Sequence, residues 1–325
     1  MRDEQLSLER LEAEVHDHNE VDRMAAALDS HPDFKILRRM PTGRFEVVAP
    51  SGLKTRKVAI LDVETTGLDP EHDKIIEFAA LVLEVDAATS DFVCTVDSYE
   101  EFEDPGFSIP AEVTAINGIA DTDVAGRRLD DARLANMFSG VHLVIAHNAG
   151  FDRQFVERRL PIFQEMKWAC SLTQVDWKAE GIGSAKLDYL AYQLGFFYEA
   201  HRARADCMAL ATVLSSPLPR TGTTGLSQLL SASESEAIRI WATRAPFESK
   251  DILKGHGFSW DSTRKCWHLT VTRAMLNEEV RWMQDNAYGG RAINIELEVL
   301  DPTVRFSRRP GRLVSKSIPA AKQPA

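Results

Sequence analysis

The segment Val58–Leu68, VAILDVETTGL, constrains the fold more than any other part of the sequence. Its apolar run is typical of a buried strand, and the run ends in Asp62 and Glu64 before a Thr-Thr-Gly turn. Because side chains alternate between the two faces of a strand, both carboxylates point to the same side, one pleat apart. Neighbouring carboxylates on a buried strand repel each other and lose hydration. The segment therefore predicts a divalent cation bound between them.

Apolar runs and helical periodicities around this segment predict an α/β domain over residues 57–216. In such a domain, functional groups gather where strands end. The predicted strands are Val58–Glu64, Ile75–Val85, Phe92–Val96, Val141–Ala146 and Met166–Cys170. The predicted helices are Arg128–Phe138, a helix from Asn148 to Arg159, Leu187–Leu194 and Ala203–Leu214.

Four further regions flank this domain. Residues 1–56 predict an appendage, in which a helix over residues 5–29 precedes a hairpin with strands Phe34–Met40 and Arg44–Ala49. Residues 217–235 are rich in Ser, Thr, Pro and Gly and predict a linker. Residues 236–301 predict a small α+β accessory domain in the order β-α-β-β-α-β. Residues 302–325 have six basic and no acidic side chains, and they predict a basic, disordered tail.

The charge of the chain is unevenly distributed. The net charge is −11, but residues 220–325 carry 16 Lys and Arg against 11 Asp and Glu. This asymmetry indicates a C-terminal part that contacts nucleic acid, or else a solvated tail. The four cysteines form no CxxC pair, which disfavours a zinc site and a disulfide framework. With no signal peptide and no apolar run near the roughly 20 residues that span a bilayer, we expect a cytoplasmic protein without a membrane partner.

Four carboxylates and one histidine stand at predicted strand ends or helix starts, and they are candidates for a single site. Asp62 and Glu64 belong to the first strand, Asp152 to the helix after the fourth strand, and His201 and Asp206 to the sequence HRARAD. Such hard oxygen ligands suit Mg²⁺ or Mn²⁺. Two such ions about 4 Å apart can activate a water and stabilise the leaving oxygen of a phosphodiester. Since histidine changes charge near neutral pH, His201 is the candidate general base.

Three motifs carry a resemblance to a known family: DVETTG, HNAGFD and HRARAD, in this order and at these separations. They resemble the exonuclease motifs of the DEDDh family, to which the proofreading epsilon subunit of bacterial DNA polymerase III belongs. The resemblance covers about residues 57–215 and implies a ribonuclease H-like fold, with a mixed five-stranded sheet flanked by helices. It also implies two-metal hydrolysis of phosphodiester bonds from a 3′ end, with release of nucleoside 5′-monophosphates.

The resemblance also implies roles for individual residues. The implied metal ligands and catalytic carboxylates are Asp62, Glu64, Asp152 and Asp206, and the implied general base is His201. The candidate substrate-binding residues are Thr65, Thr66, Leu68, Asn148 and Phe151, although core packing explains Phe151 equally well. The segment IPAEVTAINGIADTDV resembles the family's His-Gly-Ile-Thr segment, with Asn117 in place of the His and Ala120 in place of the Thr.

Single-stranded DNA is the substrate that we expect, with a polymerase or a repair protein as a partner. Two alternatives are a 3′–5′ exoribonuclease of the same fold and a non-catalytic, nucleic-acid-binding or polymerase-associated subunit. In the accessory domain, Trp260 and Trp267 flank a basic turn that contains Arg264 and Lys265. Aromatic and basic residues together can stack bases and hold phosphates. Core packing is the simpler explanation for Trp267, and Trp260 stays open.

Overall fold

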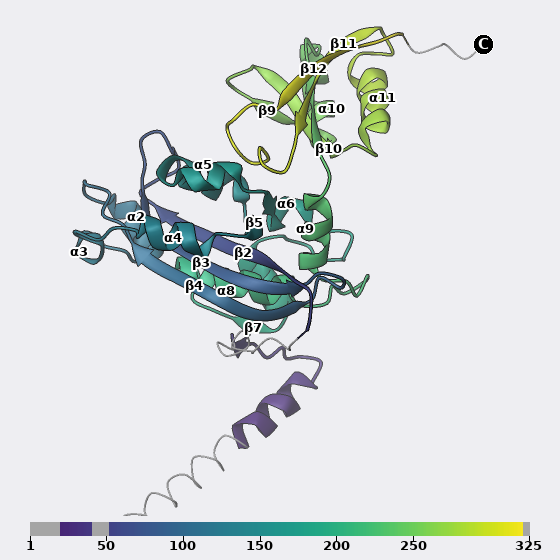
Figure 1. Ribbon diagram of the computed structural model, residues 1–325. Coiled ribbons are helices and arrows are strands. Elements are labelled where there is room, and N and C mark those ends of the chain that lie inside the picture. The colour runs from purple at the N-terminus through teal and green to yellow at the C-terminus, as the bar shows by residue number, and fades with distance from the viewer. Residues whose placement is uncertain (1–19, 41–51, 321–325) are drawn as a thin grey trace, which may run out of the picture.

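The computed structural model describes residues 20–40 and 52–320, which contain two α/β units stacked on each other (Figure 1). The larger unit is built on a five-stranded mixed sheet in the order β4-β3-β2-β5-β6. β2 and β4 run antiparallel to β3, whereas β5 is parallel to both β2 and β6. The strands are β2 (Thr55–Thr65), β3 (Ile75–Asp86), β4 (Phe92–Phe102), β5 (Val141–Ala146) and β6 (Trp168–Cys170). The mixed sheet confirms the predicted fold class.

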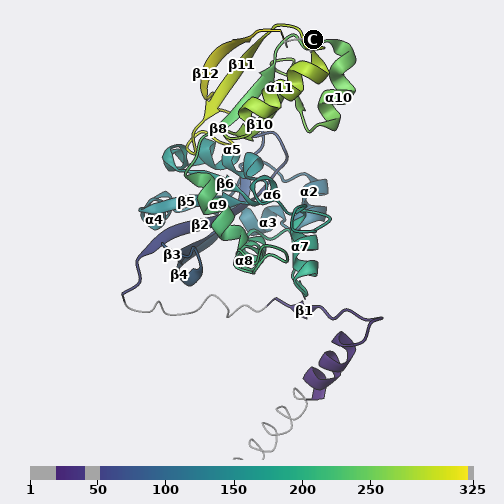
Figure 2. The same cartoon turned by 90° about the vertical axis from the view of Figure 1, so that its right-hand side faces the viewer.

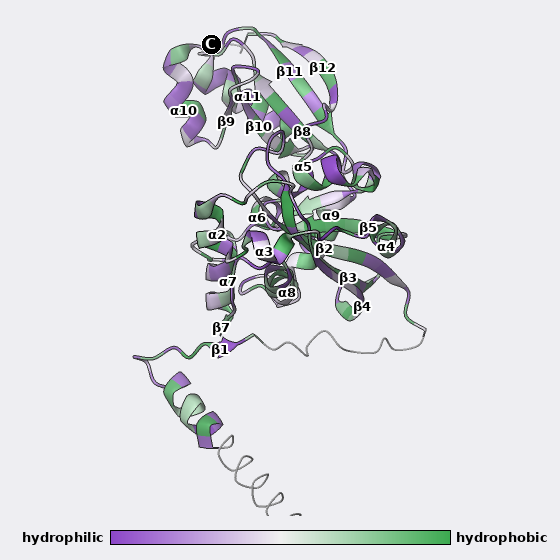
Figure 3. Cartoon of the chain, turned by 90° about the vertical axis from the view of Figure 1, so that its left-hand side faces the viewer, coloured by the Kyte–Doolittle hydropathy of each residue, from purple (hydrophilic) through white to green (hydrophobic). Residues whose placement is uncertain are grey.

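Side chains of β2 alternate between two apolar layers, one on each face of the sheet. Val58 and Ile60 pack into one layer, and Ala59 and Leu61 pack into the other. Apolar residues concentrate on these central strands, between the two helical layers (Figure 3). Because the alternation has a period of two residues, the carboxylates that follow Ile60 on the same face lie on the side of the first layer.

Helices cover both faces of the sheet. The first layer is completed by α7 (Leu187–Gln193), α8 (Ala203–Leu214) and α9 (Gly225–Ser233). The second layer is completed by α4 (Asp131–Met137), α5 (Ala149–Arg159) and the 3₁₀ helix η2 (Pro161–Glu165). The connections contain the short helices α2 (Ala111–Asn117), α3 (Asp121–Val124) and α6 (Ser171–Gln174). The active-site candidates from α5 and α8 thus approach β2 from opposite faces.

The structure corrects the predicted boundary of β4 and shows a strand partner for part of the first predicted hairpin strand. β4 continues beyond Val96 because its backbone pairs with β3 as far as Phe102. β1 (Arg38–Arg39) pairs in parallel with β7 (Phe196–Phe197), and a parallel pair needs a long crossover in place of a tight turn. Residues 20–29 are helical as predicted. The first part of that predicted helix and the second hairpin strand, Arg44–Ala49, lie outside the described residues.

A helix occupies about half of the predicted linker. α9 begins within residues 217–235, and its Leu226, Leu229 and Leu230 are buried against the first layer. The hydroxyl of Thr224 accepts a hydrogen bond from the backbone N–H of Ser227 at 3.1 Å and caps the helix. The Ser- and Thr-rich composition therefore reflects a capped helix with an apolar face, which explains why the linker prediction is wrong here.

The smaller unit has an antiparallel sheet in the order β12-β11-β8-β10-β9. It contains the β-α-β-β-α-β order that the sequence predicts, with β12 as an additional edge strand. Its strands are β8 (Ala237–Ala242), β9 (Ser259–Asp261), β10 (Cys266–Thr272), β11 (Ile293–Leu300) and β12 (Arg312–Ile318). Its helices are η3 (Phe247–Ser249), α10 (Lys250–Gly255) and α11 (Leu276–Ala287).

The predicted disordered tail is wrong over its described residues, which end at residue 320. β12 pairs with β11 from Arg312 to Ile318, and it thereby satisfies the backbone groups at the edge of that strand. The preceding residues 301–309, which we call the strap, pack against α5 of the larger unit. Figures 1 and 2 show the smaller unit next to this helix. The backbone N–H of Trp168 donates to the carbonyl oxygen of Pro302 at 3.0 Å. The positive charges of the strap are therefore used in contacts between the two units.

No helix within residues 20–40 and 52–320 combines the length and the apolar character needed to cross a membrane. Of the four cysteines, Cys94, Cys170 and Cys207 are buried.

Candidate active site

Three carboxylates meet where β2 ends and α8 begins. Asp62 and Glu64 extend from β2, and Asp206 extends from the first turn of α8. One carboxylate oxygen from each residue lies within 4.8 Å of the other two. The pleat of β2 places Asp62 and Glu64 on one face, and the packing of α8 on that face adds Asp206, so three of the four acids that the sequence predicts lie together.

Burial and mutual repulsion disfavour the charge of this cluster. Burial raises the pKa of Asp62 well above its ordinary value, and the charges of Asp152 and Asp206 raise it further. Burial also raises the pKa of Glu64 to about 7 and raises the pKa of Asp206. A divalent cation removes this repulsion, and three carboxylates are the hard donors that suit Mg²⁺ or Mn²⁺. The donor set therefore fits the metal dependence that the sequence predicts.

Asp152 approaches the cluster from α5, on the other face of the sheet. It is buried, and its Oδ1 accepts a hydrogen bond at 3.2 Å from the backbone N–H of Val63, the residue between the two β2 carboxylates. Burial raises the pKa of Asp152 to about 8. Among the described residues, Asp152 is not a member of the group whose oxygens all lie within 4.8 Å of one another. Asp152 therefore lies next to the cluster, and its hydrogen bond to Val63 connects it to β2.

The loop before α8 presents His201 at the edge of the cluster. His201 is exposed and has a positive φ of 65°, a conformation that residues other than glycine seldom adopt. Its backbone N–H donates to Oδ2 of Asp206 at 2.9 Å, and the hydroxyl of Tyr198 donates to Oδ1 at 2.9 Å. Burial raises the pKa of Glu64, and a protonated His201 opposes that increase. The two hydrogen bonds orient Asp206 and hold the backbone of the histidine beside it.

An ion pair between a buried glutamate and a solvent-exposed arginine fixes the start of α8. Glu77 lies directly opposite Glu64 in the register of β2 and β3, and it is fully buried. Its Oε1 lies 2.8 Å from Nη2 of Arg202, and its Oε2 accepts from the backbone N–H of Ala203 at 3.0 Å. Arg202 follows the candidate base directly in the chain. The sequence analysis missed this pair, although a single glutamate within the apolar run IIEFAALVL is a detectable signal.

Asn117 contacts the cluster from the end of α2. Its Nδ2 donates to Oε2 of Glu64 at 3.3 Å, and its Oδ1 accepts from the backbone N–H of Ile119 at 3.0 Å. Burial raises the pKa of Glu64, and the hydrogen bond that Asn117 donates lowers it in part. The residue that replaces the family's histidine thus orients a cluster carboxylate, which its position in the sequence alone did not indicate.

The candidate substrate-binding residues of the first motif form a tight turn. The hydroxyl of Thr65 donates to the carbonyl oxygen of Gly67 at 2.6 Å, and that of Thr66 donates to Oδ1 of Asp73 at 3.1 Å. A Cβ atom at position 67 would overlap the carboxylate of Asp73, so a side chain there would displace that carboxylate from its hydrogen bonds to Thr66 and Asp69. Leu68 is 84% exposed at the end of this turn. The turn therefore uses both hydroxyls internally and presents one apolar side chain to solvent.

The candidates of the second motif lie at the start of α5. Asn148 occupies the N-cap position with a φ of 79°, is exposed, and makes no capping hydrogen bond with its side chain. Its amide is free to contact a ligand. Phe151 is half-buried and packs against Phe155, with ring centroids 5.0 Å apart. Phe151 thus belongs in part to the second apolar layer.

The fold and the site define a DEDD-type exonuclease domain of the ribonuclease H-like superfamily. Residues 59–214 match the RNase T family, whose description is "Exonuclease". This match covers just under half of the chain and places the similarity in the larger unit. The fold implies dependence on a divalent metal ion, and the acidic cluster fits that requirement.

Comparisons with known proteins find bacterial replication polymerases. The chain is 31% identical over 167 residues to the PolC-type DNA polymerase III of Clostridium perfringens, a match that covers 48% of this chain and 11% of the polymerase. It is 35% identical over 107 residues to the PolC-type DNA polymerase III of Listeria welshimeri, covering 32% of this chain and 7% of the polymerase. The match thus spans about a tenth of the length of these relatives.

Solved structures of exonucleases are also similar. Exonuclease X in complex with 5′-overhanging duplex DNA is 25% identical, with 53% of this chain and 96% of that chain covered and a TM-score of 0.39. Exonuclease I of E. coli in complex with an oligonucleotide is 18% identical, with 57% of this chain and 48% of that chain covered and a TM-score of 0.39.

Proposed function

We propose that the protein is a metal-dependent 3′–5′ exonuclease that acts on DNA, prefers single strands, and releases nucleoside 5′-monophosphates. The observation that carries this proposal is the three-carboxylate cluster, with Asp152 hydrogen-bonded behind it and His201 exposed beside it. The similarity of the domain to DNA polymerase III of the PolC type supports DNA as the substrate. A polymerase or repair partner and a cytoplasmic location are parts of the same proposal.

The residues divide the work of hydrolysis. Asp62, Glu64, Asp206 and Asp152 would hold the divalent ions, and we propose two ions in the site. When bound, these ions supply an activated water and stabilisation of the phosphoryl charge. His201 accepts the proton of the attacking water, because it is exposed to solvent at the rim of the cluster. The hydrogen bonds to Asp206 and Glu64 keep both carboxylates oriented before substrate arrives.

The 3′-terminal nucleotide is held by the turn that follows β2 and by the start of α5. Leu68 offers an exposed apolar surface on which a terminal base can pack, and a leucine that is 84% exposed gains by being covered. The backbone around Thr65, the turn residue Thr66 and the free amide of Asn148 offer polar groups near the same end of the sheet. Phe151 contributes the edge of its half-buried ring.

A labelled-oligonucleotide assay tests the proposal. Single-stranded DNA, duplex DNA and RNA, each labelled at the 5′ end or at the 3′ end, are incubated with Mg²⁺, Mn²⁺ or EDTA. We expect shortening from the 3′ end, mononucleotide products, fastest cleavage of single-stranded DNA, and no cleavage in EDTA. Cleavage from the 5′ end contradicts the polarity, and faster cleavage of RNA assigns the exoribonuclease alternative.

Replacing the candidate base tests its role. His201→Ala should slow hydrolysis by about 10²–10⁴-fold, the usual contribution of general acid–base catalysis, while the affinity for Mn²⁺ measured by calorimetry stays within error. His72→Ala, which changes an exposed histidine paired with Asp69, is the matched control. Loss of Mn²⁺ binding in His201→Ala would show that the histidine maintains the metal site, and it would contradict its role as general base.

A further inference from the structure

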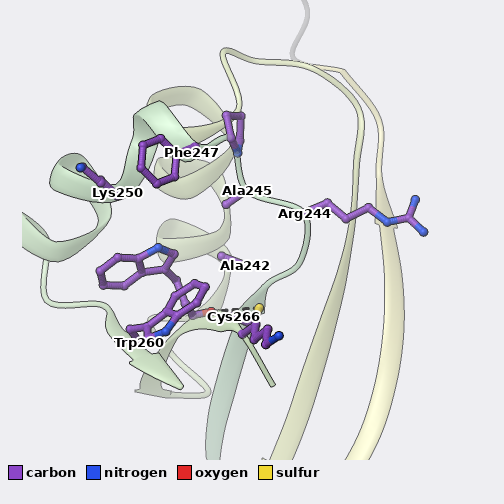
Figure 4. Close-up of a pocket in the computed structure, with 10 residues that line it drawn as sticks. Ala242, Arg244, Ala245, Phe247, Lys250, Trp260 and Cys266 are labelled. Atoms are coloured by element: carbon purple, nitrogen blue, oxygen red, sulfur yellow. Dashed lines mark hydrogen bonds between the residues drawn. The ribbon is translucent and has the colours of Figure 1, made fainter. Parts of the chain in front are cut away.

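The smaller unit contains a pocket that the exonuclease site does not use. It lies between η3 and the start of α10 on one side and the β9–β10 hairpin on the other, and its volume is about 290 Å³ (Figure 4). Ligand pockets generally span about 300–1,000 Å³, so this pocket suits one group of nucleobase size.

Aromatic side chains face solvent at this pocket. Phe247 is 76% exposed and Trp260 is 51% exposed, and Figure 4 shows them across the pocket from each other. Trp267 is half-buried in the core of the unit, and its ring meets Trp260 edge-on, with centroids 5.5 Å apart. This contact holds Trp260 in place while much of its ring stays open to solvent. Two exposed aromatic rings on opposite walls are suited to stacking on a flat ligand.

The charged side chains at this pocket are all cationic. Lys250, Lys265 and Arg244 line it, and the described residues contribute no carboxylate to its lining. Nζ of Lys250 lies 4.7 Å from the centre of the Phe247 ring, and Arg244 extends away from the rings on the opposite side in Figure 4. Arg244 and Lys265 have positive φ values of 57° and 50°. Such backbone strain in two lining residues is common where a surface is kept for binding.

Within residues 20–40 and 52–320, these three cations form no ion pair, which leaves them available to an anion. Arg264 differs from them, although it belongs to the same predicted basic turn. Its guanidinium pairs with Glu296 and lies 4.1 Å from the centre of the Trp241 ring. Of the two basic residues of the turn, Lys265 therefore lines the pocket, whereas Arg264 contacts residues of the sheet.

We infer that this pocket binds an unpaired nucleotide of a single-stranded nucleic acid, with the base between Phe247 and Trp260 and the flanking phosphates near Lys250, Lys265 and Arg244. Base–aromatic stacking with backbone cations is how single strands are held without readout of sequence. The charge complementarity is local, because the whole chain has a net charge of −11. The pocket is thus a second contact for the strand, and its role in catalysis rests on the proposed function.

Binding without hydrolysis tests this inference. The full-length protein in EDTA is titrated into a fluorescently labelled oligothymidylate, and the affinity is measured by anisotropy. Phe247→Ala with Trp260→Ala should weaken binding by about tenfold or more, since each stacked base contributes strongly to affinity. Lys250→Gln and Lys265→Gln should each lower the slope of log affinity against log salt by about 0.7.

Matched controls separate the pocket from the rest of the surface. Phe34→Ala removes an exposed aromatic ring from the N-terminal part of the chain, and Arg281→Gln removes an exposed cation of α11. Neither residue lines the pocket, so neither variant should change the affinity or the salt slope. If the double variant has a lower melting temperature than the wild type, Phe247→Ala alone replaces it in the test. This side chain is largely exposed, so its removal should not unfold the unit. Unchanged affinity in folded pocket variants would overturn the inference.

Two further measurements distinguish this inference from the proposed function. Cleavage of the p-nitrophenyl ester of thymidine 5′-monophosphate, which is too short to reach a second site, should be equal in the wild type and the pocket variants. If the pocket variants weaken binding but the wild-type protein has no nuclease activity, the inference is retained and the proposed function is rejected. If the protein is a nuclease but the pocket variants bind as the wild type does, the proposed function is retained and the inference is rejected. Oligouridylate should bind as the DNA does, whereas tighter binding of duplex DNA would overturn a site for unpaired bases.

Discussion

Asp62 is a carboxylate at a position where burial and four neighbouring acids oppose its charge. We expect Asp62→Asn to lower the nuclease rate by about a thousandfold or more, because several kcal/mol of transition-state stabilisation depend on the bound cations. The same change should raise the melting temperature of the metal-free protein, because it replaces a carboxyl whose ionisation the fold disfavours by a neutral amide. Nuclease assays and calorimetric scans in EDTA check both results. Asp285→Asn, at an exposed position of α11, serves as the control, and a less stable Asp62→Asn protein would contradict the electrostatic explanation.

The pKa values of the site predict how metal stabilisation depends on pH. Burial raises the pKa of Glu64 to about 7 and that of Asp152 to about 8, so protonated carboxyls favour the metal-free fold. Their stabilising effect is complete below the ordinary carboxyl pKa of about 4 and is lost as the pH rises through 7 to 8. The gain in melting temperature on adding Mn²⁺ should therefore be small at pH 5 and larger at pH 8. A gain that falls with rising pH would contradict this prediction.

At the scale of elements, the ion pair between Glu77 and Arg202 joins β3 to the start of α8. Arg202→Ala leaves a fully buried carboxylate without its cation, and we expect it to lower the free energy of unfolding by about 3 kcal/mol. Adding Glu77→Gln should recover part of this loss, because the amide is neutral and can still accept from Ala203. Urea unfolding of the two single variants and the double variant measures the coupling. Additive effects would show that the pair does not act as a unit.

The strap provides a test of how the two units are joined. Arg309 Nη2 lies 3.1 Å from Oε1 of Glu157 and donates to the carbonyl oxygen of Gln164 at 2.6 Å, whereas Arg308 pairs with Glu71 on the surface. Arg309→Ala should lower the free energy of unfolding by about 1–3 kcal/mol, because it leaves partly buried acceptors unsatisfied. Arg308→Ala should change it by less than about 1 kcal/mol. Chemical unfolding and the rate of proteolysis within residues 301–309 check this difference.

For the molecule as a whole, the strap places the smaller unit against the helix that carries Asp152. Nη1 of Arg153 is buried and donates to the carbonyl oxygen of Arg305 at 2.6 Å, and its Nε pairs with Glu157 at 2.7 Å. The residue next to a site carboxylate is therefore held by the C-terminal part of the chain. The proposed pocket for a single strand is thereby connected to the exonuclease domain by hydrogen bonds and ion pairs.

Local patterns of the sequence determined the central strand, the helices α4, α5, α7 and α8 of the larger unit, and the candidate carboxylates. Alternation and helical periodicity depend on residues a few positions apart, so a pattern such as VAILDVE is readable without a fold. The small unit's β-α-β-β-α-β order was readable for the same reason. The expectation of a linker and of a disordered tail failed, because Ser-rich and basic stretches have the same composition whether they are solvated or packed.

Only the tertiary structure decided which distant groups support the site and join the units. Asn117 reaches Glu64, Arg202 reaches Glu77, and the strap reaches α5. Each contact depends on the register of the sheet and on the packing of helices over it, which no local pattern specifies. The sequence by itself determined that DVETTG carries two carboxylates on one face of a strand. The packing of α8 on β2 decided that Asp206 completes the cluster, and the packing of α5 decided that Asp152 lies next to the cluster, hydrogen-bonded to β2. The physical reason is that buried charges and buried backbone donors must all find partners in the same structure.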